Sequence, residues 1–366
     1  MGVLGVYEIV VTRFNTVFIA ALSIFSSAAA QSLDADLRGA LDTAMKENGI
    51  VGASVAVVRK GNPIFMAQVG YANQESRTPV SKATTFALGT TGQLFISISA
   101  LAQVDSGKWT LDSVLPESKP KSITLRQALG QASGLSDFTQ DPQFDQSEIY
   151  GFASLYKMAL VKADRPGERF SYSESNALLV SQALFRLTDE PIGETVLRTV
   201  FRPAGMTTAK FEPSAATAKG YFSDGSGDKS AARAISAYPV GLASLYGAQF
   251  TANIDDMLAF DRAVRGRKLL SAKIWNQALT PVSTKTGASE FGLGFDMAEI
   301  LENEKWYGRS GGTDGFSSCY FRVDATDTSI IILLNTDNQD GFEIARSMYE
   351  IIRADDELKS QGTSGT

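Results

Sequence analysis

The sequence predicts a mixed α/β (α+β) fold with one antiparallel sheet formed by the N- and C-terminal segments. A hairpin pattern lies near the start, where β-rich runs at 53–58 and 64–71 are joined by the turn 60–63 with its Gly-Asn pair. Further β-rich runs lie near the end, at 317–323 and 329–334. The residues between carry helical patterns, so we expect flanking helices and an inserted, mostly helical lobe.

The individual elements follow from apolar spacing. Steps of three and four residues predict helices over 33–48, from Gln93 to near Gly107, and over 177–187, 255–264 and 342–352. The run 329–334 is apolar at nearly every position, which predicts a strand buried on both faces. Gly, Ser, Ala and Asp dominate 214–236, which is typical of a surface loop. We predict a signal peptide over 1–30, a sheet lobe over 31–85 and 237–355, a helical lobe over 86–236 and a flexible tail over 356–366.

The N-terminal segment has the features of a signal peptide. Arg13 precedes an apolar run over 17–25, and Ala28-Ala29-Ala30 follows as an A-x-A cleavage signal. The run is too short to span a bilayer as a mature helix. We therefore expect cleavage after Ala30, a periplasmic or secreted protein and no stable membrane span. Because Glu8 lies in an unusually long leading region, a later start codon and an uncleaved anchor stay open as alternatives.

Composition restricts the chemistry. The chain has 34 basic and 40 acidic residues and a net charge of −6, which argues against a nucleic-acid partner and favours a small-molecule or peptide ligand. There is no histidine, so Ser-His-Asp catalysis and His-ligated zinc are excluded. Cys319 is the only cysteine, which excludes an internal disulfide and a cysteine-clustered metal site. We expect no cofactor and no metal, and Cys319 is predicted to be a small buried hydrophobe.

The stretch 86–95 contains the strongest candidate for a reactive residue. Apolar spacing starts a helix directly after Gly92, which puts Thr90 at a helix N-terminus. A hydroxyl there lies near free backbone N–H groups that can stabilise an attacked carbonyl oxygen as it gains charge. Gln93 follows three residues later on the same face of the first turn.

Four segments resemble the serine beta-lactamase and penicillin-binding-protein superfamily, especially its class C and D-Ala-D-Ala carboxypeptidase branch. Residues 86–93 are similar to Phe-x-Ile-Gly-Ser-x-x-Lys, the nucleophile motif. Residues 123–135 resemble ITIRHLLTHTSGL, residues 166–174 resemble PGEKFSYSN, and residues 201–207 resemble FxPLGMT. The resemblance covers nearly all of the chain after residue 30. It implies the same fold that the strands at both ends and the helices between them predict.

The resemblance also implies where a site would lie. In this superfamily three motifs converge on the cleft between the lobes: Ser-x-x-Lys, Tyr-x-Asn, and Lys-Thr-Gly or His-Thr-Gly. The matching positions here are Thr90 and Gln93, then Tyr172 and Glu174, then Arg309, Ser310 and Gly311, followed by Gly312. The resemblance implies an oxyanion hole formed by the N–H groups of Thr90 and Gly312.

Three literal motif matches are set aside because of their context. Lys285-Thr286-Gly287 spells the third motif but precedes the Phe-Gly-Leu-Gly-Phe segment at 291–295, so we assign it to a loop. Residues 118–121 and 226–229 match S-x-x-K, but neither precedes an apolar helix.

The substitutions leave two functions open. Gln93 cannot usefully accept a proton from Thr90, and it carries no charge that would lower a neighbouring pKa. We expect Glu174 to pair with Arg309, which makes the motif side chains neutral in sum. The first function is that of a degenerate family member with little or no hydrolase activity and a retained ligand-binding cleft. The second is that of an active hydrolase of peptide, ester or amide bonds, with Thr90 as nucleophile and Tyr172 as base.

Each candidate residue also has a purely structural interpretation. Thr90 could be only an N-cap, and Gln93 only a neutral polar filler. Tyr172 could be a packing residue, and Arg309 with Glu174 a stabilising ion pair.

Overall fold

The computed structural model describes residues 33–145, 148, 150–211, 214, 216–223, 233–234 and 250–363. The predicted signal peptide, the S-x-x-K pattern at 226–229 and most of the predicted loop 214–236 lie outside these residues. No helix within the described ranges has the length and apolar character needed to cross a membrane.

The central sheet joins the two ends of the chain, as predicted. It has seven strands in the order β11-β12-β13-β14-β1-β2-β3, and every neighbouring pair is antiparallel. The strands are β1 (Gly52–Arg59), β2 (Asn62–Asn73), β3 (Thr78–Pro79), β11 (Asp296–Leu301), β12 (Glu304–Thr313), β13 (Phe316–Val323) and β14 (Thr328–Leu334). The N-terminal hairpin pairs with the last strand, Val55 opposite Ile332. The predicted fold class is therefore confirmed.

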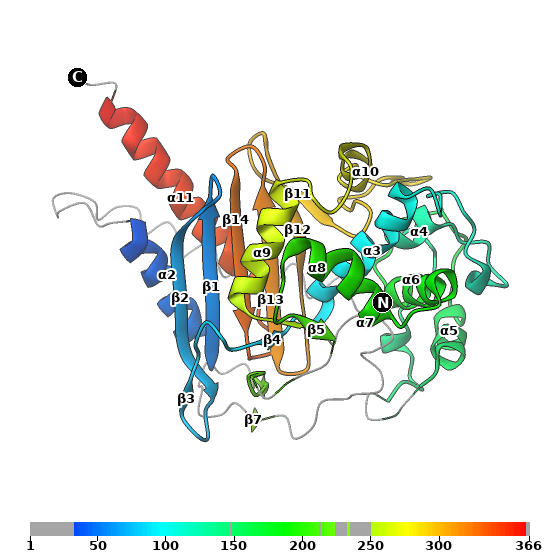
Figure 1. Cartoon of the computed structure of the whole chain (residues 1–366), viewed down its shortest axis with the longest axis horizontal. Helices are drawn as coiled ribbons and strands as arrows, with labels where there is room; N and C mark the ends of the chain where they lie inside the picture. Colours follow the sequence, from blue (N-terminus) through cyan, green and yellow to red (C-terminus); the bar gives the residue numbers. More distant parts are fainter. Residues whose placement is uncertain are drawn as a thin grey trace.

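Helices cover both faces of this sheet (Figure 1). On one face α2 (Leu33–Glu47) and α11 (Gly341–Thr363) pack on alternate residues of β1 and β14, among them Val55 and Ile332. On the other face α9 (Ile254–Arg265) and the helical lobe pack on the residues between, among them Ala56 and Ile331. Strand β14 is buried at all positions, as its apolar run predicts.

The helical lobe is built around α3 (Gln93–Asp105) and α6 (Glu174–Thr188). The other elements of the lobe and its surroundings are η2 (Gly89–Gly92), η3 (Pro116–Ser118), α4 (Leu125–Leu129), η4 (Phe138–Gln140), α5 (Phe152–Leu160), α7 (Ile192–Val196), η5 (Leu197–Phe201), α8 (Arg202–Ala204) and α10 (Ala272–Ala278). Short strands are β4 (Phe86–Ala87), β5 (Lys210–Phe211), β6 (Tyr221–Phe222), β7 (Arg233–Ala234), β8 (Phe250–Ala252), β9 (Ser283–Thr284) and β10 (Gly287–Ala288). The predicted helices over 33–48, from 93, over 177–187 and over 255–264 correspond to α2, α3, α6 and α9.

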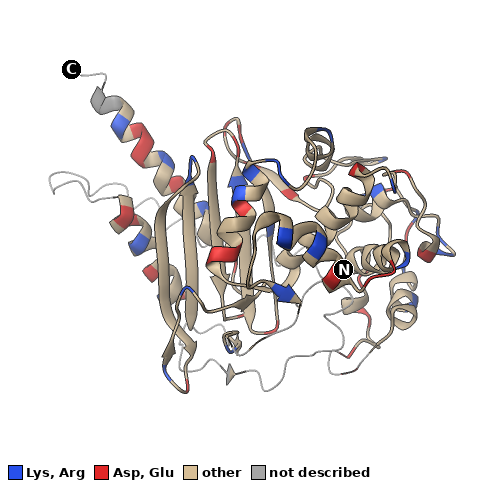
Figure 2. Cartoon of the chain, in the orientation of Figure 1, with Lys and Arg blue, Asp and Glu red and all other residues tan. Residues whose placement is uncertain are grey.

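Helix α11 is longer than the sequence predicts. It continues past Ile352 to Thr363 and so includes residues 356–363 of the predicted tail. The added turns have little apolar pattern and are held by charged pairs, visible as blue and red bands along α11 in Figure 2. Arg59 on β1 donates to Asp356 at 2.7 Å, and Lys359 pairs with Asp355 at 2.6 Å. Ion pairs to the sheet and along the helix thus replace the apolar spacing on which the prediction depended.

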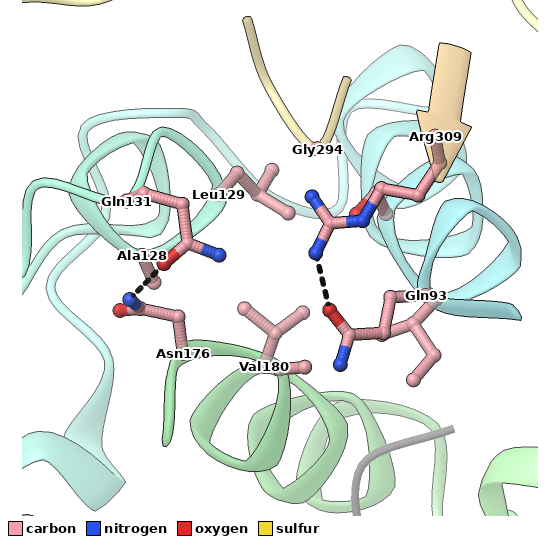
Figure 3. A pocket seen from close by; sticks show the side chains of 11 residues that line it. Gln93, Ala128, Leu129, Gln131, Asn176, Val180, Gly294 and Arg309 are labelled. Atoms are coloured by element: carbon pink, nitrogen blue, oxygen red, sulfur yellow. Dashed lines mark hydrogen bonds between the residues drawn. The ribbon is translucent and has the colours of Figure 1, made fainter. Parts of the chain in front are cut away.

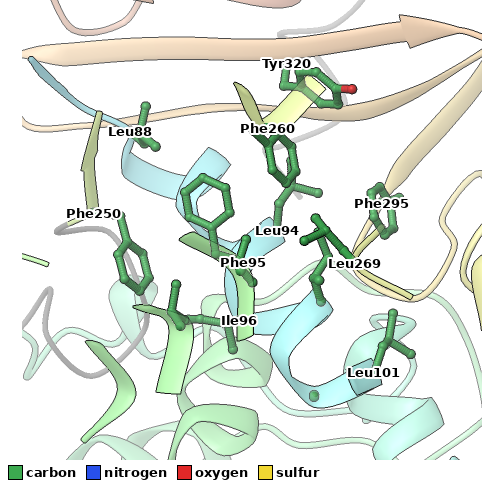
Figure 4. Close-up of a cluster of buried hydrophobic side chains, with 14 of the residues drawn as sticks. Leu88, Leu94, Phe95, Ile96, Leu101, Phe250, Phe260, Leu269, Phe295 and Tyr320 are labelled. Atoms are coloured by element: carbon green, nitrogen blue, oxygen red, sulfur yellow. The ribbon is translucent and has the colours of Figure 1, made fainter. Parts of the chain in front are cut away.

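Phe95 is the centre of the core between α3 and the sheet (Figure 4). Its ring is fully buried and meets the rings of Phe201, Phe250 and Phe260 edge-on at centroid distances of 5.0, 5.7 and 5.2 Å. Phe95→Ala is expected to lower the free energy of unfolding by about 3–5 kcal/mol, because it removes buried area and leaves a cavity. Urea unfolding measures this. Phe185→Ala, at a ring that is 43% exposed, is the control and should cost less than about 1 kcal/mol.

Candidate functional site

Thr90 is placed beside Glu174 and β12 by a tight turn that is anchored to the sheet. The turn begins at Gly89, whose φ of 52° lies in the left-handed region, and a Cβ there would come 2.3 Å from the carbonyl carbon of Gly312. Thr91 then donates to the carbonyl of Ser318 at 3.2 Å. The turn continues as η2 into α3, so Thr90 is not an N-cap: the N-caps of η2 and α3 are Leu88 and Gly92.

Strand β12 lies directly against the Thr90 side chain. A Cβ on Gly311 would come 2.5 Å from the Cβ of Thr90, so only glycine fits at this point of the strand. The Thr90 hydroxyl lies 3.3 Å from the carbonyl oxygen of Gly312 and 3.3 Å from Oε1 of Glu174, both as acceptors. The three motifs that the resemblance brings together therefore do meet around Thr90.

Gln93 connects the two charged residues of the site. Its Nε2 donates to Oε2 of Glu174, and its Oε1 accepts a hydrogen bond of 2.7 Å from Nη2 of Arg309. The Gln93 side chain is only 4% exposed. It is thus more than a neutral filler, because its amide is fixed in one orientation by an acceptor on one side and a donor on the other.

Arg309 is withdrawn into the protein and is 2% exposed. Its Nη2 also donates to the Tyr172 hydroxyl at 2.8 Å, and the guanidinium lies 5.1 and 5.2 Å from the ring centroids of Tyr172 and Phe291. Its ion pair is with Asp296 on β11, where Nη1 lies 3.5 Å from Oδ1.

The predicted ion pair between Glu174 and Arg309 is therefore wrong. The Tyr172 hydroxyl and the Gln93 amide lie between the two side chains: Tyr172 donates to Oε1 of Glu174 at 2.7 Å and accepts from Arg309. Counting Asp296, the site carries two carboxylates and one guanidinium, so its formal charge is −1 rather than the zero expected from the motif side chains.

Tyr172 is poorly suited to be a base. Burial of its hydroxyl raises the pKa of Tyr172 well above its ordinary value, and the nearby Glu174 carboxylate raises it further, against the lowering effect of Arg309. The ring itself is 40% exposed. The Tyr172 hydroxyl therefore stays protonated and donates a hydrogen bond to Glu174.

The Glu174 carboxyl should produce a pH-dependent stability. Burial raises its pKa above the ordinary value of 4.5, and the charge of Asp137 acts in the same direction, against the hydrogen bond from Tyr172 and the charge of Arg309. A raised pKa in the folded state means that ionisation of Glu174 disfavours folding. The contribution of Glu174 to the free energy of unfolding is therefore fully present below pH 4.5 and is lost as pH rises through the folded-state pKa. The free energy of unfolding of the wild type, measured relative to Glu174→Gln, should therefore fall as pH rises above 4.5. A difference that stays constant from pH 4 to 8 would contradict the shift.

A small cavity lies behind the network, between α3, α4 and α6 (Figure 3). Its volume is about 20 Å³, which is room for one water molecule. Its polar lining comes from Gln93, Ser97, Gln131, Asn176 and Arg309. Oε1 of Gln131 accepts from the backbone N–H of Ser173 at 3.0 Å and from Nδ2 of Asn176. Gln131 thus holds the start of α6, and with it Tyr172 and Glu174.

The Ser310 side chain points away from this network: its hydroxyl lies 3.5 Å from the carbonyl oxygen of Ser318 on β13, while its backbone N–H lies 3.4 Å from Oδ2 of Asp296. The motif matches that were set aside lie outside the network. Lys285 is in the turn between β9 and β10 and pairs with Glu168 at 2.9 Å, in accord with its assignment to a loop. Ser118 donates to the carbonyls of Leu115 and Lys121 in a local turn.

Two residues of the site were missed from the sequence. Asp296 had no motif around it, and its contact with Arg309 depends on the register of β11 against β12, where Asp296 lies opposite Gly308. Gln131 did carry a signal, since it replaces a histidine in the segment that resembles ITIRHLLTHTSGL. Within the described residues no group of three or more His, Cys, Asp or Glu side chains is placed to hold a metal ion.

An antiparallel sheet formed by both ends of the chain, with a hydroxyl-bearing turn and helix packed against β12, is the arrangement of the beta-lactamase and penicillin-binding-protein class of folds. The family described as Beta-lactamase matches residues 37–353. The chain belongs to this family.

Known proteins resemble the chain over most of its length. It is 25% identical over 326 residues to PbpX of Bacillus subtilis (strain 168), which is named as a penicillin-binding protein. The match covers 84% of this chain and 76% of that protein. It is 24% identical over 304 residues to the D-aminopeptidase of Gluconobacter oxydans (strain 621H), covering 78% of this chain but only 55% of that protein. The solved D-amino acid amidase of Ochrobactrum anthropi SV3, complexed with L-phenylalanine amide, superposes with a TM-score of 0.76 at 20% identity, over 88% of this chain and 99% of that one.

Proposed function

We propose that this chain is a catalytically degenerate member of its family, with little or no hydrolase activity and a retained cleft for a small-molecule or peptide ligand. The observation that carries the proposal is the position of Gln93. It occupies the place one helical turn after Thr90, and both ends of its amide are engaged by Glu174 and Arg309. An alcohol at its free pKa needs a neighbouring proton acceptor, and an amide cannot serve as one.

The contacts of the other groups support the same conclusion. Tyr172 keeps its proton, because burial raises its pKa. The resemblance implies that Arg309 binds a ligand carboxylate. In the structure, however, Arg309 is 2% exposed and is bound to Asp296, Gln93 and Tyr172. Losing one member of a catalytic unit reduces the rate by roughly 10⁴ to 10⁶.

One contact favours the second function, hydrolysis by Thr90. Its hydroxyl lies 3.3 Å from Oε1 of Glu174, within reach of proton transfer to a carboxylate. This would replace Tyr172 by Glu174 as the base. Burial raises the pKa of Glu174, which favours it as a base, but Oε1 already accepts the 2.7 Å hydrogen bond from Tyr172, which lowers that pKa and engages the oxygen nearest Thr90. We therefore place this function second.

Hydrolysis of a chromogenic ester by the wild type and by Thr90→Ala separates the two functions. Degeneracy predicts equal rates for both proteins, close to the rate without protein. A wild-type rate that is lost in Thr90→Ala would show that Thr90 is a working nucleophile and would overturn the proposal.

We propose further that the protein is exported to the periplasm or secreted. The support is the order of Arg13, the apolar run 17–25 and the Ala28-Ala29-Ala30 site. Sequencing the N-terminus of the protein from an exporting host should give Gln31 as the first residue. A chain that begins upstream of Arg13 would contradict cleavage.

A further inference from the structure

The Glu174 carboxylate is surrounded by donors in the way a bound carboxylate would be. Its Oε1 accepts from the Tyr172 hydroxyl at 2.7 Å and lies 3.3 Å from the Thr90 hydroxyl, and its Oε2 accepts from Nε2 of Gln93. These donors come from η2, α3 and the segment before α6. Two donors and the Thr90 hydroxyl, whose single proton is shared with the carbonyl oxygen of Gly312, thus converge on one carboxylate.

The positive charge of this arrangement lies behind the donors. Arg309 donates to the Tyr172 oxygen at 2.8 Å and to the Gln93 oxygen at 2.7 Å. A cation bound to the oxygen of a hydroxyl or amide strengthens the opposite end of that group as a donor. Arg309 therefore increases the attraction of both groups for the carboxylate without touching it.

The backbone holds Glu174 in this position. Glu174 is the first residue of α6, and the N-cap Ser173 accepts from the N–H of Ser175 at 3.2 Å. The Ser173 N–H is in turn bound by Gln131. A carboxylate in the first turn of a helix is also favoured by the helix dipole. The side chain is thus delivered to the donors by a rigid element.

We propose that Glu174 is a built-in ligand: its carboxylate occupies a carboxylate-binding site formed by Thr90, Gln93 and Tyr172, with Arg309 behind them. The inference rests on the proposed function, in which Thr90 is a hydrogen-bond donor and not a nucleophile. An external carboxylate is excluded from this site while Glu174 fills it. The ligand of the cleft must then bind outside the network, where the rings of Phe170 and Tyr172 are each 40% exposed.

Removing the Glu174 carboxylate should therefore leave a site for a free one. The melting temperature of Glu174→Ala is measured against increasing sodium acetate, with sodium chloride at equal ionic strength and acetamide as comparisons. Acetate should raise it in a saturable way, by about 2–4 °C at ten times its dissociation constant, while chloride and acetamide should not. Neither wild type nor Glu190→Ala, which removes an exposed glutamate paired with Arg198 at 2.7 Å, should respond specifically to acetate.

A second variant tests where acetate binds. Glu174→Ala combined with Tyr172→Phe lacks the 2.7 Å donor, so its acetate dissociation constant should rise about tenfold, the typical effect of losing one hydrogen bond to a charged group. Should Glu174→Ala fold poorly, its refolding yield is compared in acetate and in chloride, and a higher yield in acetate supports the proposal. Equal responses to acetate and chloride in both measurements would overturn it. An acyl adduct on wild-type Thr90 would defeat the proposed function instead, and the two failures are thus distinguishable.

Discussion

A variant with Thr90→Ser, Gln93→Lys, Glu174→Asn and Arg309→His is expected to be acylated by a fluorescent penicillin on the order of 10⁴-fold faster than the same variant that keeps Gln93. The lysine supplies the missing proton acceptor, and the serine removes the methyl group that lies against Gly311. Gel fluorescence over time measures the labelling rate.

The change at Arg309 is required by the structure. A lysine at position 93 would lie where Oε1 of Gln93 now accepts the 2.7 Å hydrogen bond from Arg309, and two buried cations would repel each other. The triple variant that keeps Arg309 should therefore stay unlabelled. If the fourfold variant folds with wild-type circular dichroism but labels no faster than its Gln93 control, the glutamine at position 93 is not what limits acylation at this site.

Arg309→Ala is expected to lower the free energy of unfolding by about 3–5 kcal/mol. Arg309 is 2% exposed, and its removal leaves Glu174 and Asp296 without the only guanidinium that the described residues place among them. Urea unfolding at pH 7 measures the change. Arg169→Ala is the matched control: Arg169 pairs with Asp164 at 2.6 Å but is 59% exposed, so its loss should cost no more than about 1 kcal/mol. Equal costs for the two variants would mean that the guanidinium in the site is not structurally required.

A large cost for Arg309→Ala would support the proposal that this site now serves stability rather than catalysis. A catalytic site holds charges in arrangements that favour the reaction, frequently against stability. Here Nη2 of Arg309 donates to both Gln93 and Tyr172, its buried Nε has no hydrogen-bond partner among the described residues, and the cavity behind them has room for one water molecule. These side chains form a connected polar network that links the helical lobe to β12.

Local patterns in the sequence predicted the frame of the protein well. The Gly-Asn turn at 61–62 and the apolar runs of β1 and β14 depend on residues close together in the chain, and so does the start of α3. The resemblance then brought Thr90, Gln93, Tyr172, Glu174, Arg309, Gly311 and Gly312 to one place, and the structure confirms that they meet.

The partners inside the site could not be predicted in the same way. Opposite charge suggested that Glu174 pairs with Arg309, but the Tyr172 hydroxyl and the Gln93 amide lie between them, and Asp296 is reached only through the β11–β12 register. The length of α11 was missed for a related reason, because the ion pair from Arg59 to Asp356 joins residues far apart in the sequence.

We propose that an alcohol without an adjacent amine stays unreactive in this fold. Intact-mass spectrometry of the wild type after an hour with excess penicillin measures this, with the fourfold variant as the comparison. An unchanged wild-type mass and an adduct of one penicillin on the variant are expected. A wild-type adduct that peptide mapping places on Thr90 would contradict it.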